Sequence, residues 1–91
     1  MAIGIYFTPK SFSKEQYDLS VEKLDAAGAG LPGGRLHHFA LDFKSGISVF
    51  DIWESMEQFE EFGKTLVPIL EELGVDPGEP YIQPVHNTIE G

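Results

Sequence analysis

Apolar residues alternate with small or polar residues in four segments, and this two-residue period predicts four β-strands. The segments are 3–8, 35–43, 47–53 and 81–89. The alternation is clearest in 3–8, where large apolar residues occupy the odd positions and Pro9 ends the pattern. Because proline cannot donate a hydrogen bond to a neighbouring strand, Pro84 predicts that the last segment is an edge strand or contains a bulge.

A helical period of apolar residues follows the first strand segment. Ser13 and Gln16 have the spacing of a capping box, and Phe12 can pack against Tyr17 as a hydrophobic staple. The side chains expected to face the core follow the spacing i, i+4, i+7 and are Tyr17, Val21 and Leu24. The helix is expected to end near Gly28, where a glycine can adopt a left-handed conformation.

A second, longer helix is predicted over 55–73. Ser55 and Gln58 repeat the capping signature at its start. Its apolar stripe consists of Met56, Phe59, Phe62, Leu66, Leu70 and Leu73. Pro68 removes a backbone donor inside this pattern, so we expect a kink or break near Val67, with Pro68 opening a final turn.

The elements follow one another in the order β-α-β-β-α-β, which predicts a single α+β domain over residues 1–91. Right-handed crossovers then give a ferredoxin-like topology, a four-stranded antiparallel sheet with two helices on one face. Segment 47–53 carries apolar residues on both of its faces, for example Val49 and Phe50, which is typical of a sheet buried on both sides. We therefore expect a second copy to cover the helix-free face in a homodimer.

Composition and charge narrow the classes of partner. Six Lys and Arg residues stand against fifteen Asp and Glu residues, which gives a formal net charge of −9. The basic residues form no patch that could neutralise phosphates, which argues against nucleic-acid binding, and the acidic surface argues against anionic membranes. No apolar window approaches the roughly 18 residues of a membrane span, and the first residues lack a signal-peptide pattern. A cytoplasmic protein is the expectation.

Residues 28–33 match the G-x-G-x-x-G pattern of dinucleotide-binding loops. In such sites the glycines follow a strand and open a helix, so that the helix N-terminus meets the pyrophosphate. Here the run follows a predicted helix and precedes a predicted strand. We interpret it as a helix stop and a flexible loop, and we expect no nucleotide cofactor.

Asp51 and Trp53 share one face of the third strand segment, because side chains alternate along a strand. One interpretation is a pocket floor in which Trp53 is an aromatic wall and Asp51 is a hydrogen-bond acceptor or base. The alternative is a structural role, with the Trp53 N–H satisfied and Asp51 either capping a loop or paired with an arginine such as Arg35. A buried carboxylate is costly without a partner, so Asp51 needs one in either case.

His37 and His38 point to opposite faces of the second strand segment, and the hairpin loop decides which of them faces the pocket. A three-residue loop places His37 beside Trp53. A two-residue turn at Ser45 and Gly46 places His38 there instead. We favour His38, because the opposite face then carries an uninterrupted apolar row. That row consists of Phe39, Leu41 and Phe43.

His86 and Asn87 lie in the last strand segment. A histidine there could act as a general base near neutral pH. With His38 and Asp51, His86 could also complete a two-histidine, one-carboxylate iron site. No local spacing supports metal binding, so we expect no metal.

The run 49–55, Val-Phe-Asp-Ile-Trp-Glu-Ser, followed by Glu57, Phe59 and Phe62, resembles the strand–helix junction of antibiotic-biosynthesis-monooxygenase-like domains in the dimeric α/β-barrel superfamily. The resemblance implies that two sheets form an eight-stranded barrel across a homodimer, with a small pocket between each sheet and its own helices. Members include cofactor-free oxygenases acting on phenolic polyketides, haem-degrading enzymes, isomerases and stress-induced proteins.

This resemblance implies a small cofactor-independent monooxygenase acting on an aromatic or carbonyl compound. The residues that could abstract a proton are His38, His86 and Asp51, and those that could contact the substrate are Tyr6, Trp53, Phe59 and Asn87. Haem-degrading relatives carry an axial histidine on the second helix, and 55–73 contains none, so we expect no cofactor.

The alternative is a non-catalytic dimer that binds a small hydrophobic ligand, or a stress-related protein. The enzyme hypothesis requires an enclosed cavity of a few hundred Å3 and at least one His or Asp without a structural partner. The binding hypothesis requires no such free group.

Overall fold

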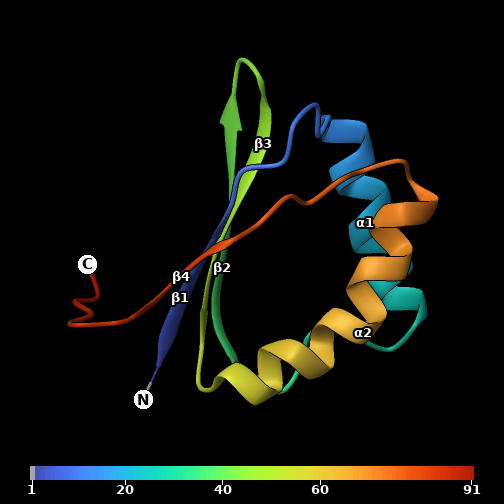
Figure 1. Ribbon diagram of the computed structural model, residues 1–91. Helices are drawn as coiled ribbons and strands as arrows, with labels where there is room; N and C mark the ends of the chain where they lie inside the picture. Colours follow the sequence, from blue (N-terminus) through green and yellow to red (C-terminus); the bar gives the residue numbers. More distant parts are fainter. Residues whose placement is uncertain (1) are drawn as a thin grey trace.

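Two helices pack on the same face of one antiparallel sheet (Figure 1). The structure is a computed structural model and describes residues 2–91. Its elements are β1 (Ile3–Phe7), α1 (Lys14–Ala26), β2 (Arg35–Phe43), β3 (Gly46–Trp53), α2 (Met56–Glu72) and β4 (Tyr81–Pro84). The strand order is β2-β3-β1-β4, and each neighbouring pair is antiparallel. The predicted ferredoxin-like α+β fold is confirmed.

The hydrophobic core lies between the sheet and the helices. Strand residues of one parity point into it, and Ile5 and Trp53 are fully buried there. The other buried apolar residues of the core are Phe12, Leu24, Ile47, Val49, Phe62, Leu70 and Val75. The row formed by Ile47, Val49, Asp51 and Trp53 therefore places one carboxylate within an otherwise apolar face of β3.

Both helices begin as the capping signatures predict. At α1, the Gln16 N–H donates to the Ser13 hydroxyl at 3.1 Å, and the Ser13 N–H donates to the Gln16 side chain at 2.9 Å. At α2, the Gln58 N–H donates to the Ser55 hydroxyl at 3.3 Å. These bonds satisfy backbone donors that have no partner inside a helix.

The core-facing stripe of α1 differs from the prediction. Leu24 is buried, but Val21 is 39% exposed, and Ser20 is buried instead. Val21 borders a cavity between the two layers.

Of the predicted kink or break near Val67, the break does not occur. Helix α2 continues through Pro68 to Glu72, although it changes direction along its length (Figure 1). Pro68 leaves the carbonyl of Lys64 without its usual helical donor. Both residues are exposed, so water can hydrate that carbonyl and the helix persists.

Strand β4 is shorter than predicted and ends at Pro84 rather than at residue 89. Among the described strands it pairs with β1 alone, so it lies at the sheet edge as the proline indicated. Beyond it, the Val85 N–H donates to the Ala2 carbonyl at 3.0 Å. Residues 85–91 form no strand in the described structure.

Within residues 2–91, no helix covers the other face of the sheet (Figure 1). Large apolar and aromatic side chains point outward from this helix-free face. The most exposed, at 37% to 66%, are Phe39, Leu41, Phe43, Phe50 and Tyr81. The expected apolar row on β2 is therefore present.

Candidate active site

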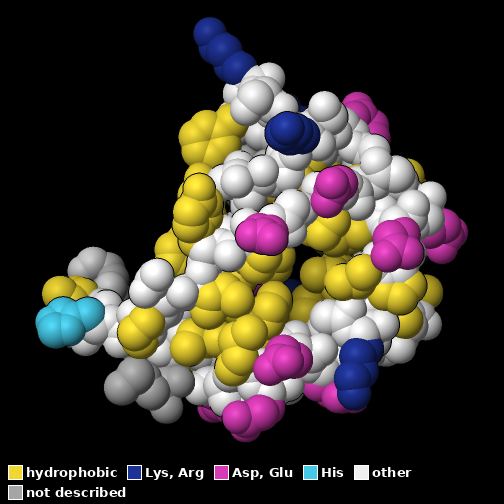
Figure 2. Space-filling model, in the orientation of Figure 1, with side chains coloured by type: hydrophobic (Ala, Val, Ile, Leu, Met, Phe, Trp, Pro, Cys, Tyr) yellow, Lys and Arg dark blue, Asp and Glu magenta, His cyan; other side chains and the backbone are white. Residues whose placement is uncertain are grey.

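A cavity of about 170 Å3 lies between the sheet and the two helices. Figure 2 shows it as a hollow bordered by hydrophobic side chains. Its walls are mainly apolar and include Phe7, Phe12, Val49, Phe62, Leu66 and Leu70. Five side chains add polar chemistry to this lining, namely Tyr17, Ser20, Arg35, His38 and Asp51. The cavity is smaller than the few hundred Å3 that the enzyme hypothesis required.

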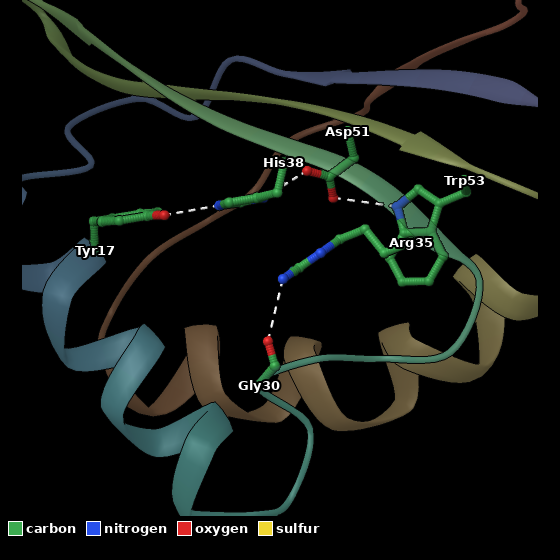
Figure 3. A network of polar contacts seen from close by, with 6 residues as sticks. All are labelled: Tyr17, Gly30, Arg35, His38, Asp51 and Trp53. Carbon is green, nitrogen blue, oxygen red and sulfur yellow. Dashed lines mark hydrogen bonds and ion pairs between the residues drawn. The ribbon is translucent and has the colours of Figure 1, made fainter.

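Asp51 lies in the middle of β3 and is 3% exposed. One carboxylate oxygen, Oδ1, lies 2.6 Å from Nδ1 of His38. The other, Oδ2, accepts a hydrogen bond of 3.2 Å from the Trp53 indole N–H (Figure 3). Each oxygen of this buried carboxylate thus has a donor, which offsets the cost of removing its charge from water.

His38 connects Asp51 to Tyr17. The pairing of β2 with β3 sets His38 directly opposite Asp51. Its other ring nitrogen, Nε2, lies 2.7 Å from the Tyr17 hydroxyl (Figure 3). When ionised Asp51 accepts the Nδ1–H, Nε2 carries a lone pair and accepts the proton of the Tyr17 hydroxyl. The polar chain therefore runs from Tyr17 through His38 to Asp51.

The Tyr17 hydroxyl is held in its neutral form. Burial raises the pKa of Tyr17 above its ordinary value of 10.0, and the negative charge of Asp51 raises this pKa further. The positive charge of Arg35 acts in the opposite direction and lowers the pKa. Tyr17 thus donates its proton to His38 and leaves its oxygen lone pairs available on the cavity side.

A β-bulge brings Arg35 into the site. The register of β2 against β3 shifts between Arg35 and His37, which sets Arg35 opposite Trp53. Strict alternation from His38 would place Arg35 on the helix-free face. The bulge turns it toward the cavity instead, as bulges near functional sites often do. Its guanidinium donates to the Gly30 carbonyl at 3.2 Å and lies 5.9 Å from the centre of the Phe62 ring.

The structure places His38 on the cavity side, as favoured, but in a register that neither hairpin alternative gave. The loop residues are Lys44 and Ser45, and Phe43 lies opposite Gly46. His38 consequently faces Asp51 rather than Trp53. Asp51 pairs with His38 and Trp53, so the alternative of an Asp51–Arg35 pair is wrong.

Tyr6, His86 and Asn87 do not join this site. They line a separate groove on the helix-free side of the sheet. Tyr6 has the opposite parity to Ile5 on β1, and residues 86 and 87 follow the end of β4. The expectation that these three share a pocket with His38 is wrong.

Trp53 and Phe59 are not among the described residues that line the cavity. Their rings pack against each other at 5.7 Å in the core, with Trp53 fully buried. The structure therefore places this pair in the core and not at the surface of the cavity, where direct substrate contact was expected. Trp53 lies behind the residues that line the cavity, and its N–H donates a hydrogen bond that orients the Asp51 carboxylate.

Sequence reasoning missed Tyr17 and Arg35 as site residues. Tyr17 reads as a core residue of α1, and it does form the predicted staple with Phe12, with ring centres 6.0 Å apart. The sequence suggested Arg35 only as a possible partner for Asp51. The one local signal was the position of Tyr17 on the inward stripe of its helix, and only the tertiary fold shows that it meets His38.

Within residues 2–91, no three His, Cys, Asp or Glu side chains are grouped so that they could hold a metal ion. The same part of the chain has no helix with the length and apolar character needed to cross a membrane.

The fold and the site together define a small ferredoxin-like α+β domain with a polar chain over an apolar cavity. No protein-family model matches the sequence, and no curated protein is significantly similar to it. Solved structures do match, and they have the antibiotic-biosynthesis-monooxygenase-like fold that the strand–helix junction implied. At these low identities the similarity establishes the fold alone.

Several of these structures span almost the whole chain, among them the following three. A protein from Chloroflexus aurantiacus J-10-fl, described provisionally as an antibiotic biosynthesis monooxygenase, is 16% identical over 100% of both chains, with a TM-score of 0.65. SnoaB from Streptomyces nogalater, a cofactor-independent oxygenase, is 17% identical over 99% of this chain and 96% of its own, with a TM-score of 0.61. A protein of unknown function from Nitrosomonas europaea is 16% identical over 99% of this chain and 92% of its own, with a TM-score of 0.61.

Proposed function

We propose that this protein is a small cofactor-independent monooxygenase-like enzyme that removes a proton from an aromatic or carbonyl compound. The observation that carries the proposal is the hydrogen-bonded chain from Tyr17 through His38 to Asp51, which ends at an apolar cavity. Such a chain is the arrangement by which a buried carboxylate orients a histidine base.

The proton would move along this chain in two coupled transfers. The Tyr17 hydroxyl gives its proton to Nε2 of His38 as its oxygen takes a proton from the substrate. The imidazolium that forms is stabilised by the ionised Asp51, which lies 2.6 Å from Nδ1. Among the described residues that line it, the cavity has no His or Asp without a partner, which the enzyme hypothesis required, because His38 and Asp51 are bonded to Tyr17, Trp53 and each other. The proposal therefore assigns the contact with the substrate to the Tyr17 hydroxyl, and His38 and Asp51 act behind it.

Arg35 would stabilise the substrate anion. Its positive charge lines the same cavity and already acts on the Tyr17 hydroxyl. A fixed cation in a site poor in water favours the charge that develops as the proton leaves. The substrate anion would then supply the electrons that reduce dioxygen, or be protonated again. The fold shared with a cofactor-independent oxygenase supports dioxygen as the oxidant.

A second candidate function is binding without catalysis. Both nitrogens of His38 and both oxygens of Asp51 already have protein partners, and no buried side-chain polar atom of the described residues lacks one. The cavity is also smaller than most ligand sites. These observations fit a small-ligand-binding or stress-related protein whose polar groups serve the fold.

The proposed enzyme works as a homodimer. The apolar side chains on the helix-free face, with Phe39 at 52% and Tyr81 at 66% exposed, provide the surface that a second copy would bury. A closed barrel of two sheets would also protect the strand edges. A cytoplasmic location, expected from the sequence, stays a prediction.

Oxygen uptake with a panel of single-ring phenols tests the proposal, with anthrone-type phenols as larger comparison compounds. We expect turnover by the wild type and a loss of about 100-fold or more in His38→Ala, since general-base catalysis contributes roughly 10²–10⁴-fold. His86→Ala is the matched control and should retain full activity, because His86 lies on the far side of the sheet. No turnover of any panel member by the wild type, or equal turnover by the two variants, would favour the non-catalytic function.

A further inference from the structure

The cavity holds a cation that the protein itself does not neutralise by an ion pair. Arg35 donates one hydrogen bond, to the Gly30 carbonyl at 3.2 Å. Within residues 2–91, no carboxylate lies within ion-pair distance of its guanidinium. A guanidinium carries five N–H donors in a planar fork, so Arg35 has capacity left for a planar anion that enters the cavity.

The rest of the cavity sets the size of that anion. Its volume is about 170 Å3, and its walls include the aromatic rings of Phe12 and Phe62 and the side chain of Leu70. An apolar protein cavity of about 150 Å3 accommodates benzene. The space therefore suits a single aromatic ring, and a fused system of two or three rings exceeds it.

We propose that the ligand is a single-ring aromatic carboxylate of about the size of benzoate. Its ring lies among the apolar walls, and its carboxylate pairs with the guanidinium of Arg35, whose fork matches the two carboxylate oxygens. This inference deepens the proposed function by naming a substrate class for the same cavity. A substrate that is turned over carries, in addition, an acidic O–H or C–H for the Tyr17 oxygen.

Because the protein is negatively charged overall, selective binding of an anion would indicate a local cation. A net charge of −9 repels small anions from the surface as a whole. An anion that binds better than its neutral analogue must therefore meet a local cation. Among the Lys and Arg side chains of the described residues, Arg35 alone lines the cavity.

Calorimetric titration with benzoate and with benzyl alcohol, its neutral analogue of similar size, tests the proposal on the wild-type protein. We expect benzoate to bind at least about tenfold more tightly than benzyl alcohol, because hydrogen bonds to a charged partner have this magnitude. We expect 2-naphthoate to bind at least about tenfold more weakly than benzoate. Equal affinity for benzoate and benzyl alcohol would overturn the carboxylate assignment, and equal affinity for benzoate and 2-naphthoate would overturn the single-ring limit.

Two variants locate the interaction. Arg35→Gln should lose the preference for benzoate. Lys44→Gln removes the same charge at the exposed tip of the β2–β3 hairpin and should keep the preference. An unchanged preference in a folded Arg35→Gln protein would overturn the role of Arg35. If that variant fails to fold, the wild-type comparison of the three ligands still decides the proposal.

The binding result is separable from the result of the oxygen-uptake assay. Selective benzoate binding without turnover of any phenol would support this ligand class and contradict the proposed enzymatic function. Turnover of single-ring phenols without selective benzoate binding would support the proposed enzymatic function and contradict this ligand class.

Discussion

Asp51 connects the fold and the chemistry at the level of single residues. It is buried at 3% exposure in a strand whose other inward side chains are apolar. Its carboxylate is held between the His38 ring and the Trp53 indole. Trp53 and Asp51 are two residues apart on one strand face, so the strand itself orients the carboxylate, and the carboxylate orients the histidine.

Asp51→Asn should abolish most of the activity while the protein stays folded. The asparagine oxygen can still accept the Trp53 N–H, but its amide would donate to Nδ1 of His38. The ring would then carry its proton on Nε2 and could no longer accept one from Tyr17. We expect a loss of about 10²–10⁴-fold in kcat/KM, with circular dichroism as the control for folding. Activity within threefold of wild type would contradict this role.

The raised pKa of Tyr17 predicts a late step in an alkaline titration. The chain has three tyrosines, and their ionisation is followed by ultraviolet absorbance. Because burial raises the pKa of Tyr17 above 10.0, its phenolate should appear only after the pH has passed that value. Tyr17→Phe should remove the late step. A variant that removes an early step instead would show that the hydroxyl is not shielded.

The raised pKa of Tyr17 also predicts that the stability of the protein falls at high pH. The unfolded chain begins to lose the Tyr17 proton near its ordinary pKa of 10.0, whereas the folded chain holds it to higher pH. The contribution of Tyr17 to stability is thus fully present below that pH and is lost as the pH rises toward the folded-state pKa. Urea unfolding at about pH 9 and about pH 11 measures the free energy of unfolding of wild type and of Tyr17→Phe. The difference between the two proteins should be smaller at the higher pH. A difference in unfolding free energy that grows with pH would contradict the raised pKa of Tyr17.

At the level of elements, the β2–β3 hairpin is held by a contact with the loop before α1. Gly46 adopts a φ of +133°, which side chains of L-residues rarely allow, and a Cβ there would lie 2.8 Å from the Phe12 carbonyl oxygen. The next residue, Ile47, donates its N–H to that same oxygen at 2.7 Å. The glycine therefore permits both the turn and the close approach.

Gly46→Ala should destabilise the protein by about 1–3 kcal/mol through backbone strain and this clash. Gly63→Ala is the matched control. Gly63 lies inside α2, and a Cβ there would meet nothing within 4 Å. That variant should be more stable than wild type by up to about 1 kcal/mol, since alanine is the better helix former. Chemical denaturation measures both, and destabilisation of equal size in the two variants would contradict the distinction.

Local signals made the helices predictable, whereas the site depended on non-local ones. The caps at Ser13 and Ser55 each lie within four residues of sequence, and the structure has both, although the reciprocal bond of the capping box forms at Ser13 and not at Ser55. The hairpin register was not predictable, because the Ile47–Phe12 bond that accompanies it joins residues far apart in the chain. The pairing of Tyr17 with His38 likewise exists only once α1 packs over the sheet.

The bulge at the start of β2 had no sequence signal. Leu36 is the extra residue between Arg35 and His37 in the pairing with β3. Alternation alone would have placed Arg35 outside the cavity. A single inserted position thus decides whether the site contains a cation.

At the level of the whole molecule, the two faces of the sheet differ in what covers them. One faces α1 and α2, and within residues 2–91 no element covers the other (Figure 1). The uncovered face carries four aromatic side chains that are each at least 37% exposed, namely Phe39, Phe43, Phe50 and Tyr81. Association with a second copy is the simplest way to remove this apolar surface from water.

Sedimentation equilibrium at micromolar concentration should find twice the chain mass of 10.1 kDa. Phe39→Glu should shift the protein to the mass of a single chain, because a buried charge without a partner opposes association. Val67→Glu is the control, since Val67 is also exposed but lies on α2, on the other side of the molecule. A wild-type protein that sediments as a single chain would contradict the dimer.

Residue, strand and fold together hold His38 in one orientation, with Nδ1 toward Asp51 and Nε2 toward Tyr17. Proton–nitrogen NMR of the histidine side chains near neutral pH observes this directly, and His38→Gln assigns the signal among the three histidines of the chain. We predict that the neutral form of the His38 ring carries its proton on Nδ1, and that this proton moves to Nε2 in Asp51→Asn. A wild-type ring with its proton on Nε2 would contradict the proposed proton chain.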